Sequence, residues 1–174
     1  MKLLNTPRIY FKGIELAQSS QIKITKELLS LIINKILIEN AGVKELHKIV
    51  NSYRIKILKR QISDIDDIVI VKKVGRMPES YKTLPAHVAL AVKRKEQGEY
   101  FYTSMRIGFI VIKDKPLTIV HKDDFTGLYD EKYYWCNQIF GPTLRLLKTV
   151  YPFENWEKYN TGNLELQQDL GAFT

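Results

Sequence analysis

Four short segments between residues 68 and 147 carry most of the structural information in this chain. They read IVIVKK at 68–73, YKTLPAHVALA at 81–91, SMRIGFIVIKD at 104–114 and YDEKYYWCNQIFGPTLRLL at 129–147. The first and third are short apolar runs, so we expect strands at 68–71 and 106–113. Because segments with a helical pattern separate and follow them, strands and helices should share one fold.

The second and fourth segments predict helices with identifiable ends. Pro85 is well placed to begin a helix, because its fixed φ suits the first turn, and Gly98 to end it. Asp130 is a candidate N-cap for a long helix that continues to about Thr149.

Two further helices are predicted before these segments. Residues 22–40 carry more apolar side chains than one helical face can hold, so this helix should be buried on most sides and end at Gly42. Residues 43–60 are amphipathic. A strand at 8–16 should come before both helices. The pattern therefore predicts an α+β fold that is mainly helical, with a few short strands.

The composition favours a polyanionic partner. The chain has 174 residues with 27 Lys and Arg against 19 Asp and Glu, which gives a net charge of +8. Nucleic acid suits this charge best, although acidic proteins or membranes would also fit. The single cysteine, Cys136, excludes an internal disulfide, and we expect a buried, inert thiol. With no long apolar run and no signal peptide, we expect a cytoplasmic protein that binds no membrane.

The same segments resemble, in the correct order, the thumb of archaeal and eukaryotic family-B DNA polymerases. KGIEL at 12–16 resembles the element that leads from the palm into the thumb, and YKTLPAHVA at 81–89 is similar to the family's Tyr-Lys-x-x-x-Pro-His-Val. SMRIGFIVIK at 104–113 resembles a thumb strand, and residues 133–145 resemble the long terminal thumb helix. The resemblance implies a palm-derived element at 1–16, a thumb at 17–152 and a flexible tail at 153–174.

The most important departure from the family pattern concerns catalysis. The two metal-binding aspartates, with their Asp-Thr-Asp turn, have no counterpart in the sequence, and neither does the basic helix that receives the triphosphate. Asp64, Asp66 and Asp67 form the nearest acidic cluster, which we interpret as a solvated linker. We therefore predict no catalytic residue, no metal site and no cofactor in this chain, with Mg²⁺ bound by a partner catalytic subunit.

The resemblance also implies which residues contact DNA. A thumb holds primer–template duplex through its phosphates, which requires positive charge on rigid elements. The predicted contacts are Lys72, Arg76 and Lys82 in a basic loop, extended by Lys12, Lys93 and Arg106, with His87 as a further candidate. The alternative is a solvated charged face.

Five tyrosines suggest a second kind of contact. They are Tyr100, Tyr102, Tyr129, Tyr133 and Tyr134. Exposed tyrosines could stack on bases, as they do in single-strand binders. Their spacing favours packing in the core instead.

The C-terminal sequence QQDLGAFT (167–174) resembles the PIP-box peptide by which replication proteins bind the sliding clamp (PCNA). One helical turn would place Leu170 and Phe173 in an apolar pocket, while Gln167 bonds at its edge. Thr174 replaces the usual second aromatic residue. The alternative is a tail that folds back on the domain.

Together these features favour a non-catalytic subunit of a split family-B replicative DNA polymerase, a nucleotidyltransferase. Its partners would be a large catalytic subunit, primer–template DNA and the sliding clamp. The alternatives are a stand-alone DNA-binding or clamp-binding accessory protein, and a fragment of a longer enzyme.

Overall fold

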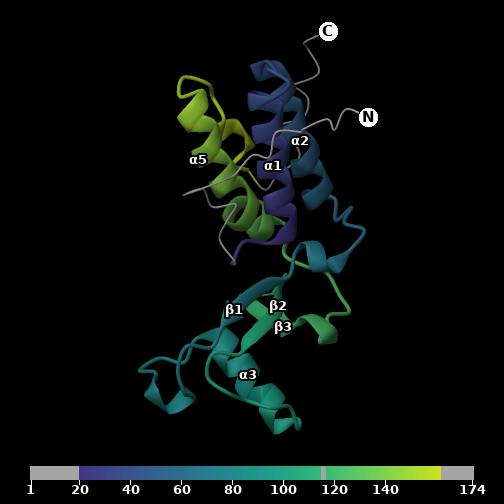
Figure 1. Cartoon of the computed structure of the whole chain (residues 1–174). Coiled ribbons are helices and arrows are strands. Elements are labelled where there is room, and N and C mark those ends of the chain that lie inside the picture. The colour runs from purple at the N-terminus through teal and green to yellow at the C-terminus, as the bar shows by residue number, and fades with distance from the viewer. Residues whose placement is uncertain (1–19, 115–116, 162–174) are drawn as a thin grey trace, which may run out of the picture.

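The computed structural model describes residues 20–114 and 117–161. A helical part and a smaller sheet part are joined end to end (Figure 1). The helical part contains α1 (Lys23–Leu37), α2 (Val43–Leu58), and a terminal helix made of α4 (Glu131–Tyr133), the π-helical η5 (Tyr134–Phe140) and α5 (Gly141–Val150). The sheet part contains β1 (Ile70–Lys73), α3 (Ala86–Glu96), β2 (Arg106–Ile112) and β3 (Thr118–His121). The chain is thus α+β, and the described helices make up far more of it than the strands do.

The three strands form one antiparallel sheet in the order β1-β2-β3. Val71 lies opposite Gly108, and Phe109 lies opposite His121. Helix α3 packs against β2 and β3. Because side chains alternate between the faces of a strand, the buried Ile107 and Phe109 face α3, whereas Arg106 and Gly108 face the beginning of α1.

The terminal helix begins where the sequence predicts. The Asp130 carboxylate accepts a hydrogen bond from the Tyr133 backbone N–H at 2.9 Å, so Asp130 is the N-cap. Pro142 has no N–H to donate to the Gln138 carbonyl in an α-helical register. That carbonyl instead accepts the hydroxyl of Thr25, which is fully buried on α1, at 3.0 Å. The proline and the π-helical turn therefore create an attachment point between the first and last helices.

Residues 154–161 pack on the helical part, although the sequence assigns them to a tail that begins at 153. Trp156 and Tyr159 are fully buried. The Trp135 indole N–H donates to the Tyr159 carbonyl at 2.7 Å, and the guanidinium of the buried Arg54 donates to the Thr161 hydroxyl at 2.9 Å. We call residues 154–161 the C-terminal strap.

The structure differs from the sequence-based expectations at three places. Gly42 does not end the first helix: it is the N-cap of α2 with φ −73°, and the left-handed residue is Asn40, with φ 50°. Helix α1 is buried or half-buried at most of its positions, as predicted, but not at its end, where Leu37 and Ile38 are 64% and 53% exposed. Strand β3 was not predicted, and its four residues are only half-buried.

Other predictions were confirmed wholly or in part, or lie outside the described residues. Helix α3 has Pro85 as its N-cap, and Gly98, with φ 98°, follows its end. Cys136 is half-buried and not buried as predicted, and burial raises the pKa of its thiol, which disfavours the reactive thiolate. The predicted strand at 8–16 lies outside the described residues. None of the helices in the described ranges combines the length and apolar character needed to cross a bilayer.

Candidate nucleic-acid interface

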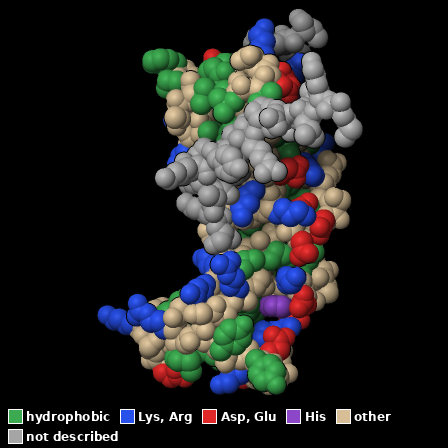
Figure 2. Space-filling view, viewed as in Figure 1, with side chains coloured by type: hydrophobic (Ala, Val, Ile, Leu, Met, Phe, Trp, Pro, Cys, Tyr) green, Lys and Arg blue, Asp and Glu red, His purple; other side chains and the backbone are tan. Residues whose placement is uncertain are grey.

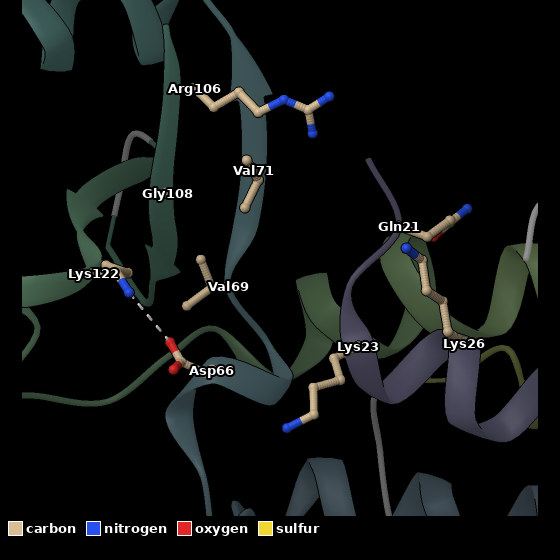
Figure 3. Close-up of a pocket in the computed structure, with 9 residues that line it drawn as sticks. All are labelled: Gln21, Lys23, Lys26, Asp66, Val69, Val71, Arg106, Gly108 and Lys122. Carbon is tan, nitrogen blue, oxygen red and sulfur yellow. Dashed lines mark ion pairs between the residues drawn. The ribbon is translucent and has the colours of Figure 1, made fainter. Parts of the chain in front are cut away.

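A pocket of about 460 Å³ lies between the beginning of α1 and the open face of the sheet (Figure 3). Its lining is mainly cationic and apolar. It consists of Gln21, Lys23, Lys26, Asp66, Val69, Val71, Arg106, Gly108 and Lys122. The helical part and the sheet part both contribute, so the pocket exists only when the two are packed together.

Gly108 shapes the sheet side of this pocket. A Cβ atom at this position would lie 3.0 Å from a Val69 methyl group and 3.3 Å from the Lys122 side chain. The absence of a side chain therefore lets Lys122 lie across β2 and enter the pocket. The glycine in SMRIGFIVIK thus has a packing role that the sequence did not reveal.

The acidic cluster forms ion pairs at the edge of the pocket. Lys23 lies 2.8 Å from Asp67, and Lys122 lies 3.6 Å from Asp66. Asp64 accepts the Asp66 backbone N–H at 2.9 Å and caps a short 3-10 helix. The hydrogen bond and charge of Asp67 raise the pKa of Lys23.

The prediction of a solvated linker is therefore wrong for Asp67, which is 8% exposed. Its carboxylate already faces an ammonium group, and so does that of Asp66, an arrangement that does not suit a divalent cation. The described residues bring no three potential metal ligands together.

Three cations around the pocket have no carboxylate partner within the described ranges. They are Lys26 on α1 and the cross-strand neighbours Lys73 and Arg106. The Lys26 and Arg106 side chains extend into the same opening from opposite sides (Figure 3). Anions that enter this opening would meet positive charge on both walls.

The basic loop continues this surface beyond β1. Arg76 and Lys82 are exposed. The loop between them contains a short 3-10 helix, Pro78–Ser80, and the Arg76 backbone N–H donates to the Tyr81 hydroxyl at 3.1 Å. Because the half-buried Tyr81 packs on the core, the loop is held in place. Figure 2 shows Lys and Arg side chains along the edge of the sheet part that borders the hollow between the two parts.

The structure separates the remaining predicted residues from the pocket. Lys72 lies opposite Ile107 on the α3 side of β1. His87 is half-buried at the beginning of α3, and burial, together with the charge of Lys72, lowers its pKa, which favours a neutral ring. Lys93 is exposed on the side of α3 away from the buried Val88.

Four predicted residues, Lys12, Gln167, Leu170 and Phe173, lie outside the described residues. Sequence reasoning also missed three lysines of the pocket, Lys23, Lys26 and Lys122. Lys23 and Lys26 lie in a predicted helix, whereas Lys122 begins a short 3-10 helix after β3. Only tertiary packing brings the three to one place. No local sequence pattern signals this.

Comparisons with known proteins agree on one family. The family model described as "DNA polymerase family B" matches residues 2–150. The DNA polymerase of Pyrococcus glycovorans is 29% identical over 92% of this chain and 20% of its own length. That of Archaeoglobus fulgidus is 27% identical over 81% of this chain and 20% of its own length. That of Methanocaldococcus jannaschii is 26% identical over 92% of this chain and 10% of its own length.

A solved structure resembles the fold as well. The family B DNA polymerase from Pyrobaculum calidifontis superimposes with a TM-score of 0.56 at 21% identity, over 72% of this chain and 18% of that one. This chain therefore spans a fifth or less of the length of these relatives.

Proposed function

Because this chain belongs to DNA polymerase family B, we propose that it is the non-catalytic thumb subunit of a split replicative DNA polymerase. The motifs at 81–89, 104–113 and 133–145 resemble thumb segments. Under this proposal the exonuclease, palm and fingers, together with the catalytic Mg²⁺, belong to a larger partner chain. This chain contributes binding to primer–template DNA and no catalytic group.

The observation that carries the proposal is a set of cations on one surface that have no carboxylate partner among residues 20–114 and 117–161. Lys26 and Arg106 line the pocket, and Lys73 is the cross-strand neighbour of Arg106. Arg76 and Lys82 are exposed on the basic loop that follows β1. Duplex DNA presents a regular row of phosphates, and cations held on packed elements can meet them whatever the base sequence. Such contacts hold the enzyme near a primer end, which suits a polymerase that must bind every sequence it copies.

The C-terminal peptide would add a second attachment. In this proposal Leu170 and Phe173 occupy the apolar pocket of the sliding clamp, and Gln167 bonds at its rim. A tethered enzyme meets its substrate at a higher local concentration, so the clamp would lengthen the time spent on one primer.

Reconstitution tests the split-enzyme proposal. The full chain should be mixed with a polypeptide that carries the exonuclease, palm and fingers of a family-B polymerase from the same source, and primer extension measured. We expect weak extension by the large polypeptide alone, none by this chain alone, and strong extension by the mixture. The reason is that neither chain alone would have both the catalytic metal ions and the complete surface that binds the duplex.

Two results would contradict the proposal. If adding this chain does not increase primer extension by the large polypeptide, and this chain still binds DNA, the alternative of a stand-alone accessory protein is favoured. Nucleotide incorporation by this chain alone would show that it contains catalytic groups of its own.

A further inference from the structure

The loop between α3 and β2 presents two tyrosines to solvent. Tyr100 is 92% exposed and Tyr102 is 61% exposed, so the prediction that they pack in the core is wrong for this pair. Phe101, between them, packs against the core, and so does Met105. Tyr129 and Tyr134, by contrast, are buried as predicted. The loop therefore directs apolar residues inward and its two tyrosines outward.

This loop is fixed at both ends. At its beginning, Gly98 turns the chain with φ 98°, and Glu99 forms an ion pair with Arg94. At its end, the Ser104 backbone N–H donates to the Val74 carbonyl at 2.7 Å, and the Val74 N–H donates to the Met105 carbonyl at 2.9 Å. A segment held in this way loses little conformational freedom when a ligand binds its side chains.

The surroundings of the tyrosines carry both charges, with cations on the side of the basic loop. The hydrogen bonds to Val74 place the loop beside the basic loop that contains Arg76. The Lys95 ammonium lies 5.9 Å from the Phe101 ring centroid. Glu99, inside the tyrosine loop, is paired with Arg94, which also lies 3.0 Å from Asp124 and 3.9 Å from Asp123 on the other side. Exposed aromatic rings among cations are the combination that binds unpaired nucleotides, because bases stack on the rings and phosphates meet the charges.

We propose that Tyr100 and Tyr102 form a stacking site for the bases of single-stranded DNA, beside the basic loop. The site goes beyond the duplex grip of the proposed function, because bases inside a duplex are already stacked on their neighbours. It also uses residues that do not line the pocket between α1 and the sheet. The chain would thus hold duplex on one surface and an unpaired strand on another.

Binding of a labelled single-stranded oligothymidylate to the full chain, followed by fluorescence anisotropy, tests this proposal. Replacing both tyrosines, Y100A with Y102A, should weaken binding about fivefold or more, because one stacked base contributes about that factor or more. The salt dependence of binding should stay the same, because no charge is removed. The variant with Y100F and Y102F keeps both rings and should bind like the native chain.

The control replaces Phe153, which is completely exposed on the helical part. F153A removes an equally accessible ring and should not change oligothymidylate binding.

Binding of the Y100A and Y102A variant at native strength would overturn the proposal. So would an equal loss of affinity for blunt duplex, since the effect would then not concern unpaired bases. If the variant instead loses association with the large polypeptide and keeps the oligothymidylate, the tyrosines form a protein interface and the proposal is wrong. Failure of reconstitution, by contrast, would leave this binding result intact.

Discussion

Arg76 and Lys82 show how charges on single residues can act on DNA without recognising sequence. Both are exposed, and within the described ranges neither has a carboxylate partner that would compete with a phosphate. Replacing both with alanine should flatten the dependence of log affinity for duplex on log salt by about two units, because two fewer counterions are released on binding. The measurement is a duplex titration at several salt concentrations.

The matched control for this pair removes the same charge elsewhere. Lys44 and Lys48 are exposed near the beginning of α2, at the end of the helical part farthest from the sheet (Figure 1). Their double alanine variant should keep the native slope. An unchanged slope for the Arg76 and Lys82 variant would mean that these residues do not touch phosphate.

The C-terminal strap illustrates an effect at the scale of elements. Its Trp156 ring lies 4.1 Å from the His47 ring on α2, and the Tyr159 hydroxyl lies 3.1 Å from Nδ1 of His47. Burial and the charge of Lys158 lower the pKa of His47, and these effects outweigh Glu154, whose carboxylate lies 3.4 Å from Nε2. The imidazole therefore packs under the strap mainly in its neutral form.

This arrangement predicts a loss of stability in mild acid. Since His47 binds a proton less readily in the folded chain than in the unfolded chain, the free energy of unfolding should fall as pH drops below about 6.5. Urea unfolding of the native chain and of His47→Gln, at matched pH values, isolates this contribution. The variant should lose less stability than the native chain over the same interval. Equal losses would show that His47 does not contribute.

A helix or strand could be predicted when a residue with distinctive backbone or side-chain chemistry marks its boundary. Pro85, Gly98 and Asp130 act through their own backbone or side-chain chemistry, so they located the ends of α3 and the beginning of the terminal helix. The end of α1 is decided by Asn40, whose left-handed conformation is less characteristic than that of glycine. Strand β3 has no strongly apolar face, because its residues are half-buried at the edge of the sheet.

The candidate site was only partly predictable for a related reason. Arg76, Lys82 and Arg106 were identified through resemblance, and the structure places the first two on one loop and Arg106 at the pocket. Lys23 and Lys122 are 99 residues apart and meet at the pocket through tertiary packing. Local sequence patterns do not show that two distant residues lie close together in the fold. For the same reason they did not predict that Tyr100 is exposed while Tyr134 is buried.

At the scale of the whole molecule, the proposed roles divide between the folded body and the C-terminal peptide. Replacing Leu170 and Phe173 with alanine should abolish association with the sliding clamp, because both apolar anchors are removed. Primer extension by the reconstituted enzyme without clamp should stay at the native level. Gln168→Ala, which lies outside the anchor spacing, serves as the control. Clamp-stimulated extension that survives the double replacement would rule out this peptide as the attachment.

The strap also limits how far such a complex could swing. The buried Arg54 holds Thr161 in place, and Gln167 follows only six residues later. Even a fully stretched chain of that length reaches about 20 Å. A clamp joined through this peptide would therefore bind within about 20 Å of the strap, so the connection would limit the distance between ring and polymerase.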